Sequence, residues 1–313
     1  MPVHALQRRH LDAVVAVADT GSVHAAARLL GIAQPALSRL LADAERALGA
    51  RLYTRSSAGS RPTDNGLTLV ASARFLLRGL ERLEAAAETE RAPIRLGCIA
   101  RGMHTLVPTL LERLYPLGQR ADATRPFCLV EGSTAALLSA AAAGELDFAV
   151  VRSSGDGPDG IALHVEPLYE ERTVIIAAAH SDLPTGPLTL ARLAAHDWIL
   201  PDVQTGSRAS FDRHWRDQGL KTIRPLVETR SFETSLALVA RTRFLSIAPE
   251  SVARRHQALG GVRIVRTRRA LPSSPVSLVC LRFARDDPSL EAFRDAIRAA
   301  AAQARAALRE VKG

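Results

Sequence analysis

Three polar side chains close to residue 35 have the chemistry needed to read a nucleic acid. Gln34, Ser38 and Arg39 supply an amide, a hydroxyl and a guanidinium, and Pro35 lies among them. An amide can pair with adenine, and a guanidinium can pair with guanine or with phosphate. The same side chains also suit an ordinary solvated helix face, so the elements that carry them must be considered next.

Residues 11–48 contain three amphipathic segments. Apolar residues of the first segment have the i, i+3, i+4, i+7 spacing of a half-buried helix: Leu11, Val14, Val15 and Ala18. Gly21 ends that helix, and Ser22 suits the N-cap of a second helix through Leu30. Gly31 then begins a tight turn into a third helix, which ends before Gly49. This order predicts a helix-turn-helix.

The third helix separates its apolar and polar side chains. One face carries Leu37, Leu41, Ala44 and Leu48. The opposite face carries Pro35, Ser38, Arg39, Ala42 and Arg46, with Gln34 at its flank. A short, polar and basic face of this kind suits insertion into a major groove.

Two short extended pieces follow the third helix and predict a wing. They comprise residues 51–55 and 61–63, around a Gly- and Ser-rich tip at residues 56–60. Arg55 and Arg61 could reach phosphate or the minor groove from this wing. Arginines on a loop are also commonly just solvated, so the wing alone does not establish contact with DNA.

A long helix is predicted from Asp64 to about Glu90, with Thr63 as its cap. Its apolar residues step by four and three, in the order Leu69, Ala73, Leu76, Leu80, Leu83 and Ala87. Such a heptad-like seam would be covered by the same helix of a second chain. The alternative is that the seam packs against its own domain.

The pattern changes at Ile94 to alternating strands and helices, which predicts parallel sheets with helices on their faces. A turn-rich break at residues 155–160 divides this part into two lobes. The second set begins with a strand at residues 172–179. A final strand at residues 276–283 and a helix from Pro288 return to the first lobe.

In open α/β sheets, ligands lie beyond the carboxyl ends of the strands. One wall of such a cleft would carry Arg101, Gly102, Ser133 and Thr134. The second wall would carry Thr205 and Ser207, at the start of a helix whose amides favour a carboxylate or phosphate. Arg101 could pair with the same anion, or it could be solvated or paired with a neighbouring acid. We therefore expect a small, anionic ligand.

Composition narrows the class of protein. The formal net charge of +9, from 41 Lys and Arg against 32 Asp and Glu, favours a polyanionic partner, although an Arg- and Ala-rich chain can also reflect a GC-rich gene. Cys98, Cys128 and Cys280 lack the spacing of a zinc site or redox pair. We expect no metal or cofactor, no membrane span and no export signal, hence a cytoplasmic protein. Without an export signal, a free-standing solute-binding protein is also disfavoured.

Enzymes form the rival class, because two α/β lobes around a cleft host many reactions. The sequence contains no nucleophile elbow, phosphate loop, HExxH motif or dinucleotide fingerprint. Its nine histidines are scattered. We therefore expect no catalytic residues and no enzymatic activity.

Several motifs at fixed separations resemble the LysR-type transcriptional regulators. Residues 26–39 read Ala-Ala-Arg-Leu-Leu-Gly-Ile-Ala-Gln-Pro-Ala-Leu-Ser-Arg. Glu45, Leu-Gly at residues 48–49, Leu-Tyr-Thr-Arg at residues 52–55 and Thr-Asp-Asn-Gly at residues 63–66 follow in register. The remainder agrees in order and length, so the resemblance covers nearly the whole chain.

The resemblance implies a mixed fold in three parts. A winged helix-turn-helix DNA-binding domain occupies residues 1–63, a linker helix 64–91, and an α/β two-lobed effector domain like a periplasmic binding protein 92–313. We place lobe I at residues 92–163 and 268–313, and lobe II at residues 164–267. The implied partners are double-stranded DNA, a small-molecule effector, further copies of the chain in a homodimer or homotetramer, and RNA polymerase.

Within the family, residues 164–183 and 198–219 are most similar to the branch of protocatechuate-pathway and sugar-linked regulators. The chain also departs from the common pattern. Ala33, at the expected DNA surface, replaces a Ser or Thr and could remove a phosphate contact. Arg101 stands where a small hydroxyl residue often follows the first sensor strand, which bears on the ligand.

Overall fold

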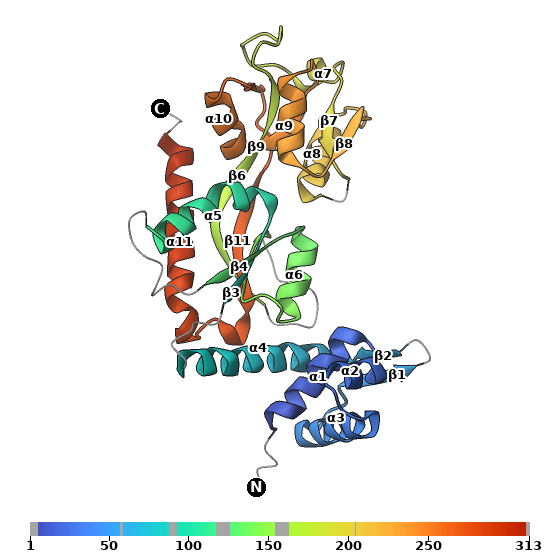
Figure 1. The fold of residues 1–313 in the computed structure, drawn as a ribbon. Coiled ribbons are helices and arrows are strands. Elements are labelled where there is room, and N and C mark those ends of the chain that lie inside the picture. Colours follow the sequence, from blue (N-terminus) through green and yellow to red (C-terminus); the bar gives the residue numbers. More distant parts are fainter. Residues whose placement is uncertain are drawn as a thin grey trace.

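A computed structural model describes residues 6–56, 59–87, 93–116, 126–153, 163–203 and 205–310 of the chain. Figure 1 shows a small helical head, a long helix, and two α/β lobes stacked beyond that helix. Within the described residues, no helix is both long enough and apolar enough to cross a membrane.

The head has the predicted order of three helices followed by a wing. Its elements are α1 (Arg8–Thr20), α2 (Val23–Leu29), α3 (Gln34–Leu48), β1 (Tyr53–Ser56) and β2 (Gly59–Pro62). Ser22 caps α2 by accepting a hydrogen bond from the Ala25 amide at 3.4 Å. Gly21 and Gly49 end α1 and α3 with φ values of 64° and 65°, which glycine adopts at little cost. The local signals in the sequence therefore specify this domain well.

The long helix α4 (Asp64–Ala87) uses its apolar seam in two ways. Thr63 caps the helix, since its Oγ1 accepts a hydrogen bond from the Gly66 amide at 2.9 Å. Leu69 and Ala73 pack into the core of the head. Leu76 and Leu83 are 53% and 68% exposed. The first half of the seam therefore packs against the head of its own chain, and Leu76 and Leu83 in its second half are exposed in the single chain.

Lobe I surrounds one sheet, in which β3 (Ile94–Cys98) lies between and parallel to β4 (Phe127–Glu131) and β5 (Phe148–Arg152). The antiparallel strand β11 (Ser273–Leu281) extends this sheet and leads through a 3-10 turn, Arg282–Ala284, toward the final helix. The covering helices are α5 (Ala100–Leu114), α6 (Thr134–Ala142) and α11 (Pro288–Glu310). Chain segments from both ends of the sensor region therefore build this lobe, as predicted.

Helix α5 begins at Ala100, two residues after the end of β3. Its first turn approaches this strand closely, because a Cβ atom on Gly102 would lie 2.4 Å from Cys98 Sγ. Arg101 and Gly102, expected beyond the carboxyl end of the strand, therefore lie in the first turn of the helix.

A single strand, β6 (Leu163–Ala178), passes from lobe I into lobe II. Its first half pairs with β11 as far as Arg172. From Thr173 onward it pairs with β9 (Ser246–Pro249) and β10 (Val262–Val265). The crossing therefore lies near residue 172, whereas the sequence placed the start of lobe II at residue 164. A strand shared by two sheets gives no turn signal at the boundary.

The remaining elements of lobe II follow the expected order. They are α7 (Leu190–Leu193), β7 (Ile199–Pro201), α8 (Gly206–Asp217), β8 (Val227–Thr229), α9 (Phe232–Ala240) and α10 (Glu250–Ala258). Trp198, Phe211 and Trp215 form an aromatic core with ring centroids 5.3–5.6 Å apart. This core fixes α8 against β7 and so positions the N-terminus of α8.

Lobe I rests on α4 through a dense polar contact. Arg74 of α4 donates to the Ala143 carbonyl at 2.7 Å and to Glu145 Oε1 at 3.3 Å. The same guanidinium also bonds Asp19 of α1. Gly144 allows the close approach, since a Cβ there would lie 2.9 Å from a backbone oxygen of α4. One arginine thus ties the head, the long helix and lobe I together.

Candidate nucleic-acid interface and ligand cleft

The start of α3 presents the predicted reading surface. Gln34, Pro35 and Arg39 are exposed and Ser38 is half-buried, while Leu37, Leu41 and Ala44 on the opposite face are buried. Ala33 is the exposed N-cap and makes no side-chain cap bond. The candidate side chains are therefore available to a partner, and the helix is held from behind.

His24 adds a contact that the sequence did not reveal. Its Nδ1 lies 3.4 Å from Gln34 Oε1, across the turn between α2 and α3. This contact restricts the Gln34 amide, which would otherwise rotate freely on an exposed helix end. Ten residues separate His24 from Gln34 in the sequence, and only the fold shows that the two side chains are neighbours.

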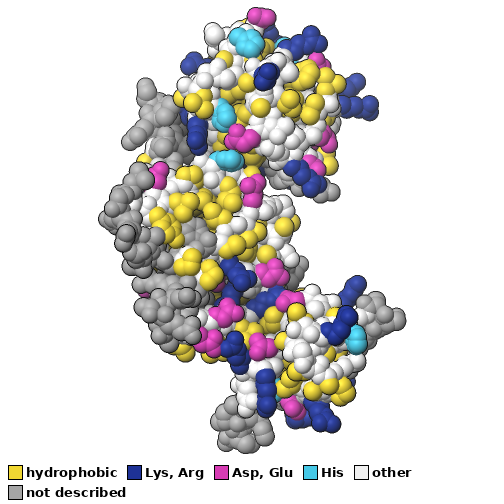
Figure 2. Space-filling view, in the orientation of Figure 1, with side chains coloured by type: hydrophobic (Ala, Val, Ile, Leu, Met, Phe, Trp, Pro, Cys, Tyr) yellow, Lys and Arg dark blue, Asp and Glu magenta, His cyan; other side chains and the backbone are white. Residues whose placement is uncertain are grey.

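The wing is held rigidly beside this surface. Glu45 of α3 accepts a hydrogen bond from the Leu52 amide at 2.8 Å, and the Ser60 amide donates to the Gly21 carbonyl at 2.8 Å. Arg61 is exposed on β2. The backbone of Arg55 lies in β1, but its side chain is outside the described part. Figure 2 shows dark-blue basic side chains on the lower part of the head, around α3.

Arg101 lies inside the sensor region and not in solvent. Its side chain is 3% exposed, and its Nη1 has no hydrogen-bond acceptor among the described residues. Burial lowers the pKa of Arg101, and the nearby charge of Glu171 partly opposes that change. A buried guanidinium with an unused donor is costly, so this position calls for an explanation.

Glu171 is already committed to other partners. Its Oε1 accepts from the Ser251 amide and its Oε2 from the Ser251 hydroxyl, both at 3.0 Å. Burial raises the pKa of Glu171, in spite of the opposing charge of Arg101. This carboxylate therefore joins β6 to the start of α10 and does not form a close ion pair with Arg101.

Arg152, at the end of β5, is a second cation of the cleft and was not predicted. Its amide donates to Thr134 Oγ1 at 3.4 Å, and its Nη2 bonds the hydroxyl of Ser274. Its Nη1 has no acceptor among the described residues and lies 4.0 Å from the position of a Cβ on Gly206. Burial lowers the pKa of Arg152 to about 10, helped by the positive charge of Arg101. Arg152 thus points from lobe I at the first turn of α8.

The predicted hydroxyl groups have structural partners. Ser133 Oγ caps α6 by accepting from the Ala136 amide at 3.2 Å. Thr205 Oγ1 accepts from the Arg208 amide and from the Ser207 hydroxyl, each at 3.3 Å, and donates to the Asp202 carbonyl. Arg152 thus connects Thr134 of lobe I with the start of α8 in lobe II. Gly102 instead has its open side toward Cys98 in the core.

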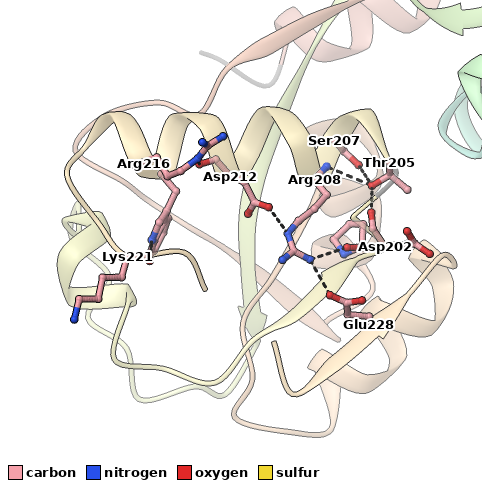
Figure 3. A network of polar contacts seen from close by, with 10 residues as sticks. Asp202, Thr205, Ser207, Arg208, Asp212, Arg216, Lys221 and Glu228 are labelled. Atoms are coloured by element: carbon pink, nitrogen blue, oxygen red, sulfur yellow. Dashed lines mark hydrogen bonds and ion pairs between the residues drawn. The ribbon is translucent and has the colours of Figure 1, made fainter. Parts of the chain in front are cut away.

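Arg208 of lobe II differs from Arg101 and Arg152, because several acceptors surround its guanidinium. Its Nε donates to Asp212 at 2.8 Å, and its Nη1 donates to the Pro201 carbonyl at 3.0 Å and to Glu228 at 3.3 Å. Figure 3 shows these bonds converging on one guanidinium below the start of α8. This network holds the helix through the Arg208 side chain and does not involve the amides of Gly206 and Ser207 at the N-terminus.

The two lobes also meet at a cluster of titratable side chains. Glu233 of α9 lies 3.6 Å from His104 of α5 and 3.6 Å from His256 of α10. Figure 2 shows histidine and acidic side chains, in cyan and magenta, close together where the two lobes join. Among the described residues, no group of three His, Cys, Asp or Glu side chains has an arrangement suited to a metal ion.

Comparison with known proteins defines the class. Residues 8–67 match the family of bacterial regulatory helix-turn-helix proteins of the lysR family, and residues 87–302 match the LysR substrate binding domain. The chain belongs to the LysR family of transcription regulators. It is a DNA-binding regulator with an effector-binding domain and not an enzyme.

Individual relatives agree with this assignment. The small neutral protease regulatory protein of Streptomyces coelicolor is 33% identical over 305 residues, covering 93% of this chain and 86% of that protein. The crystal structure of ArgP from Mycobacterium tuberculosis superposes with a TM-score of 0.73 at 22% identity, over 93% of this chain and 96% of that one. Full-length LysG of Corynebacterium glutamicum, solved with bound effector Arg, gives 0.69 at 20%, over 95% and 98%.

Proposed function

We propose that this regulator reads duplex DNA with the start of α3 and anchors the duplex with its wing. The observation that carries this is the exposure of Gln34, Pro35 and Arg39 on a helix whose other face is buried. Gln34, oriented by His24, pairs with a base edge, and Ser38 and Arg39 contact bases or adjacent phosphates. Arg55 and Arg61 bind phosphates beside the groove, and Ala33 allows close approach.

Arg39→Ala tests this proposal on DNA sites selected by the wild-type protein. A bidentate guanine contact predicts a loss of roughly 1–3 kcal/mol in binding free energy and relaxed specificity at one base pair. Arg46→Ala is the matched control, because Arg46 is exposed on the same helix and paired with Asp43 at 2.7 Å. Fluorescence anisotropy measures both. Loss of affinity equal on every sequence would make Arg39 a phosphate anchor, and no site preference in the wild type would refute the proposal.

We further propose that a small anionic metabolite binds between the lobes and changes the orientation of the heads. The supporting observation is Arg101, which is buried and forms no close ion pair with an acid among the described residues. In this proposal Thr134, Thr205 and Ser207 line the site with Arg101, whereas Gly102 faces Cys98 in the core and Ser133 caps α6. Calorimetry with aromatic and sugar acids, repeated on Arg101→Ala, tests the site. Unchanged affinity in the variant would remove Arg101 from it.

The exposed half of the α4 seam supports a dimer. Leu76 and Leu83 would be covered by α4 of a second copy, placing two recognition helices in successive major grooves about 34–36 Å apart. A sedimentation experiment showing a monomer at micromolar concentration would contradict this. Tetramers would form through further lobe contacts.

The last part of the proposal concerns where this regulator acts, what it acts on and which branch of the family it belongs to. We propose a cytoplasmic regulator that acts on RNA polymerase and belongs to the protocatechuate-pathway and sugar-linked branch. Mapping its binding sites on its own genome tests the branch, because the neighbouring genes indicate the pathway. Sites beside unrelated genes would contradict it.

A further inference from the structure

Two guanidinium groups share the cleft between the lobes, and each keeps a donor unused. Arg101 comes from the first turn of α5 and Arg152 from the end of β5. In both, Nη1 is buried and has no acceptor in the described part of the chain. The groups are close enough for the charge of Arg101 to lower the pKa of Arg152. Like charges held together out of water are unfavourable unless an anion joins them.

The first turn of α8 faces the same space from lobe II. Arg152 Nη1 lies 4.0 Å from where a Cβ on Gly206 would be, so the guanidinium and the helix N-terminus are neighbours. Of the amides in this first turn, Thr205 Oγ1 accepts a bond only from that of Arg208. The amides of Gly206 and Ser207 have no intrahelical acceptor, since the first turn of any helix leaves its amides unpaired. The cleft thus offers donors from both lobes.

We propose that the effector is a dianion, with one of its two negative charges between Arg152 and the first turn of α8 and the other on Arg101. This inference rests on the proposed effector site and specifies its ligand. Glu171 carries at most one negative charge and forms no close ion pair with either arginine among the described residues, so it cannot neutralise both. A monoanion would satisfy one guanidinium and leave the other buried without a partner. A dicarboxylate or a phosphate monoester satisfies both.

In this proposal Arg152 is the residue that distinguishes a dianion from a monoanion. Its backbone is held by Thr134 and its Nη2 by Ser274, so the guanidinium is fixed before a ligand arrives. Pre-oriented donors lose little conformational entropy on binding. Arg208, also in the first turn of α8, cannot take this role because acids and a carbonyl already occupy its donors.

Calorimetry on the full chain, at constant ionic strength, tests the proposal with matched probes. Succinate and phthalate represent dicarboxylates, inorganic phosphate represents phosphate monoesters, and propionate and benzoate are the monoanions. We expect a dianion to bind at least ten-fold more tightly than its matched monoanion. Arg152→Gln should remove that advantage and change monoanion affinity by less than three-fold, and Arg152→Lys should retain part of it. Arg216→Gln, an exposed residue of α8, is the control.

The outcomes separate this inference from the proposed function. Equal affinity for dianions and monoanions, with both lost in Arg101→Gln, would overturn the dianion and keep the anion site. A dianion advantage that survives Arg152→Gln would remove Arg152 from the site. No binding of any probe would overturn the dianion inference, and insensitivity of DNA binding to all acids would refute the proposed function. Tighter binding of phosphate than of either dicarboxylate would identify the phosphate class.

Discussion

Lobe I meets its neighbours at two junctions that use buried arginine in opposite ways. On its underside, Arg74 and Arg78 of α4 each meet a carboxylate, with Arg78 lying 3.6 Å from Asp147. Figure 2 shows acidic and basic side chains side by side where the lobe rests on the long helix. In the cleft, Arg101 and Arg152 have no ion pair within the described residues. An arginine buried with its anion fastens two parts together, whereas one buried without it marks a place for a ligand.

The largest effect is expected where a buried carboxylate loses its arginine. Arg78→Met should lower the free energy of unfolding by about 3 kcal/mol, because Asp147 is almost wholly buried and would lose the positive charge that lies 3.6 Å from it. Urea unfolding measures this. A loss below about 0.5 kcal/mol, the range of ordinary surface substitutions, would show that the contact of Arg78 with Asp147 does not stabilise the protein.

A smaller effect is expected at Arg74, the arginine of α4 that contacts both the head and lobe I. Arg74→Gln should cost about 1 kcal/mol, since Asp19 and Glu145 are both partly exposed and can turn to water. Asp19→Asn removes only the bond to the head and should cost less than half as much. Equal losses for the two variants would mean that the contact with lobe I contributes nothing. The same urea experiment serves both.

The smallest effect should have the opposite sign. Without added anions, Arg152→Met should leave the free energy of unfolding unchanged or raise it by up to about 1 kcal/mol, because an apolar side chain replaces a desolvated cation. Thermal unfolding of the two proteins in a low-salt buffer without polyanions measures this. A loss above about 1 kcal/mol would show that Arg152 stabilises the fold, as Arg74 and Arg78 do. That result would contradict the difference between the two junctions.

Local patterns in the sequence predicted the head almost completely. Ser22, Thr63 and the glycines at helix ends act within a few residues of their own position, so their structural roles can be read from spacing alone. The buried face of α3 follows from the same periodicity. The contact of His24 with Gln34, which was missed there, spans the turn between two helices.

The cleft was predicted less well because its geometry depends on distant segments. Arg152 ends an apolar strand and has no motif around it, and its importance appears only when α8 of the other lobe comes to face it. The crossing of β6 near residue 172 was misplaced because one uninterrupted strand serves two sheets. The seam of α4 showed the right period, but spacing could not tell that Leu69 and Ala73 pack into the head.

A crystal structure with a bound dianion tests the central claim most directly. Crystals of the wild-type protein would be grown with whichever dianion binds most tightly in solution. We expect its oxygens at about 2.8 Å from Nη1 of Arg101 and from Nη1 of Arg152, with one group also on the first-turn amides of α8. A ligand that binds elsewhere, or one that reaches the cleft while both guanidinium groups keep their unused donors, would contradict the account.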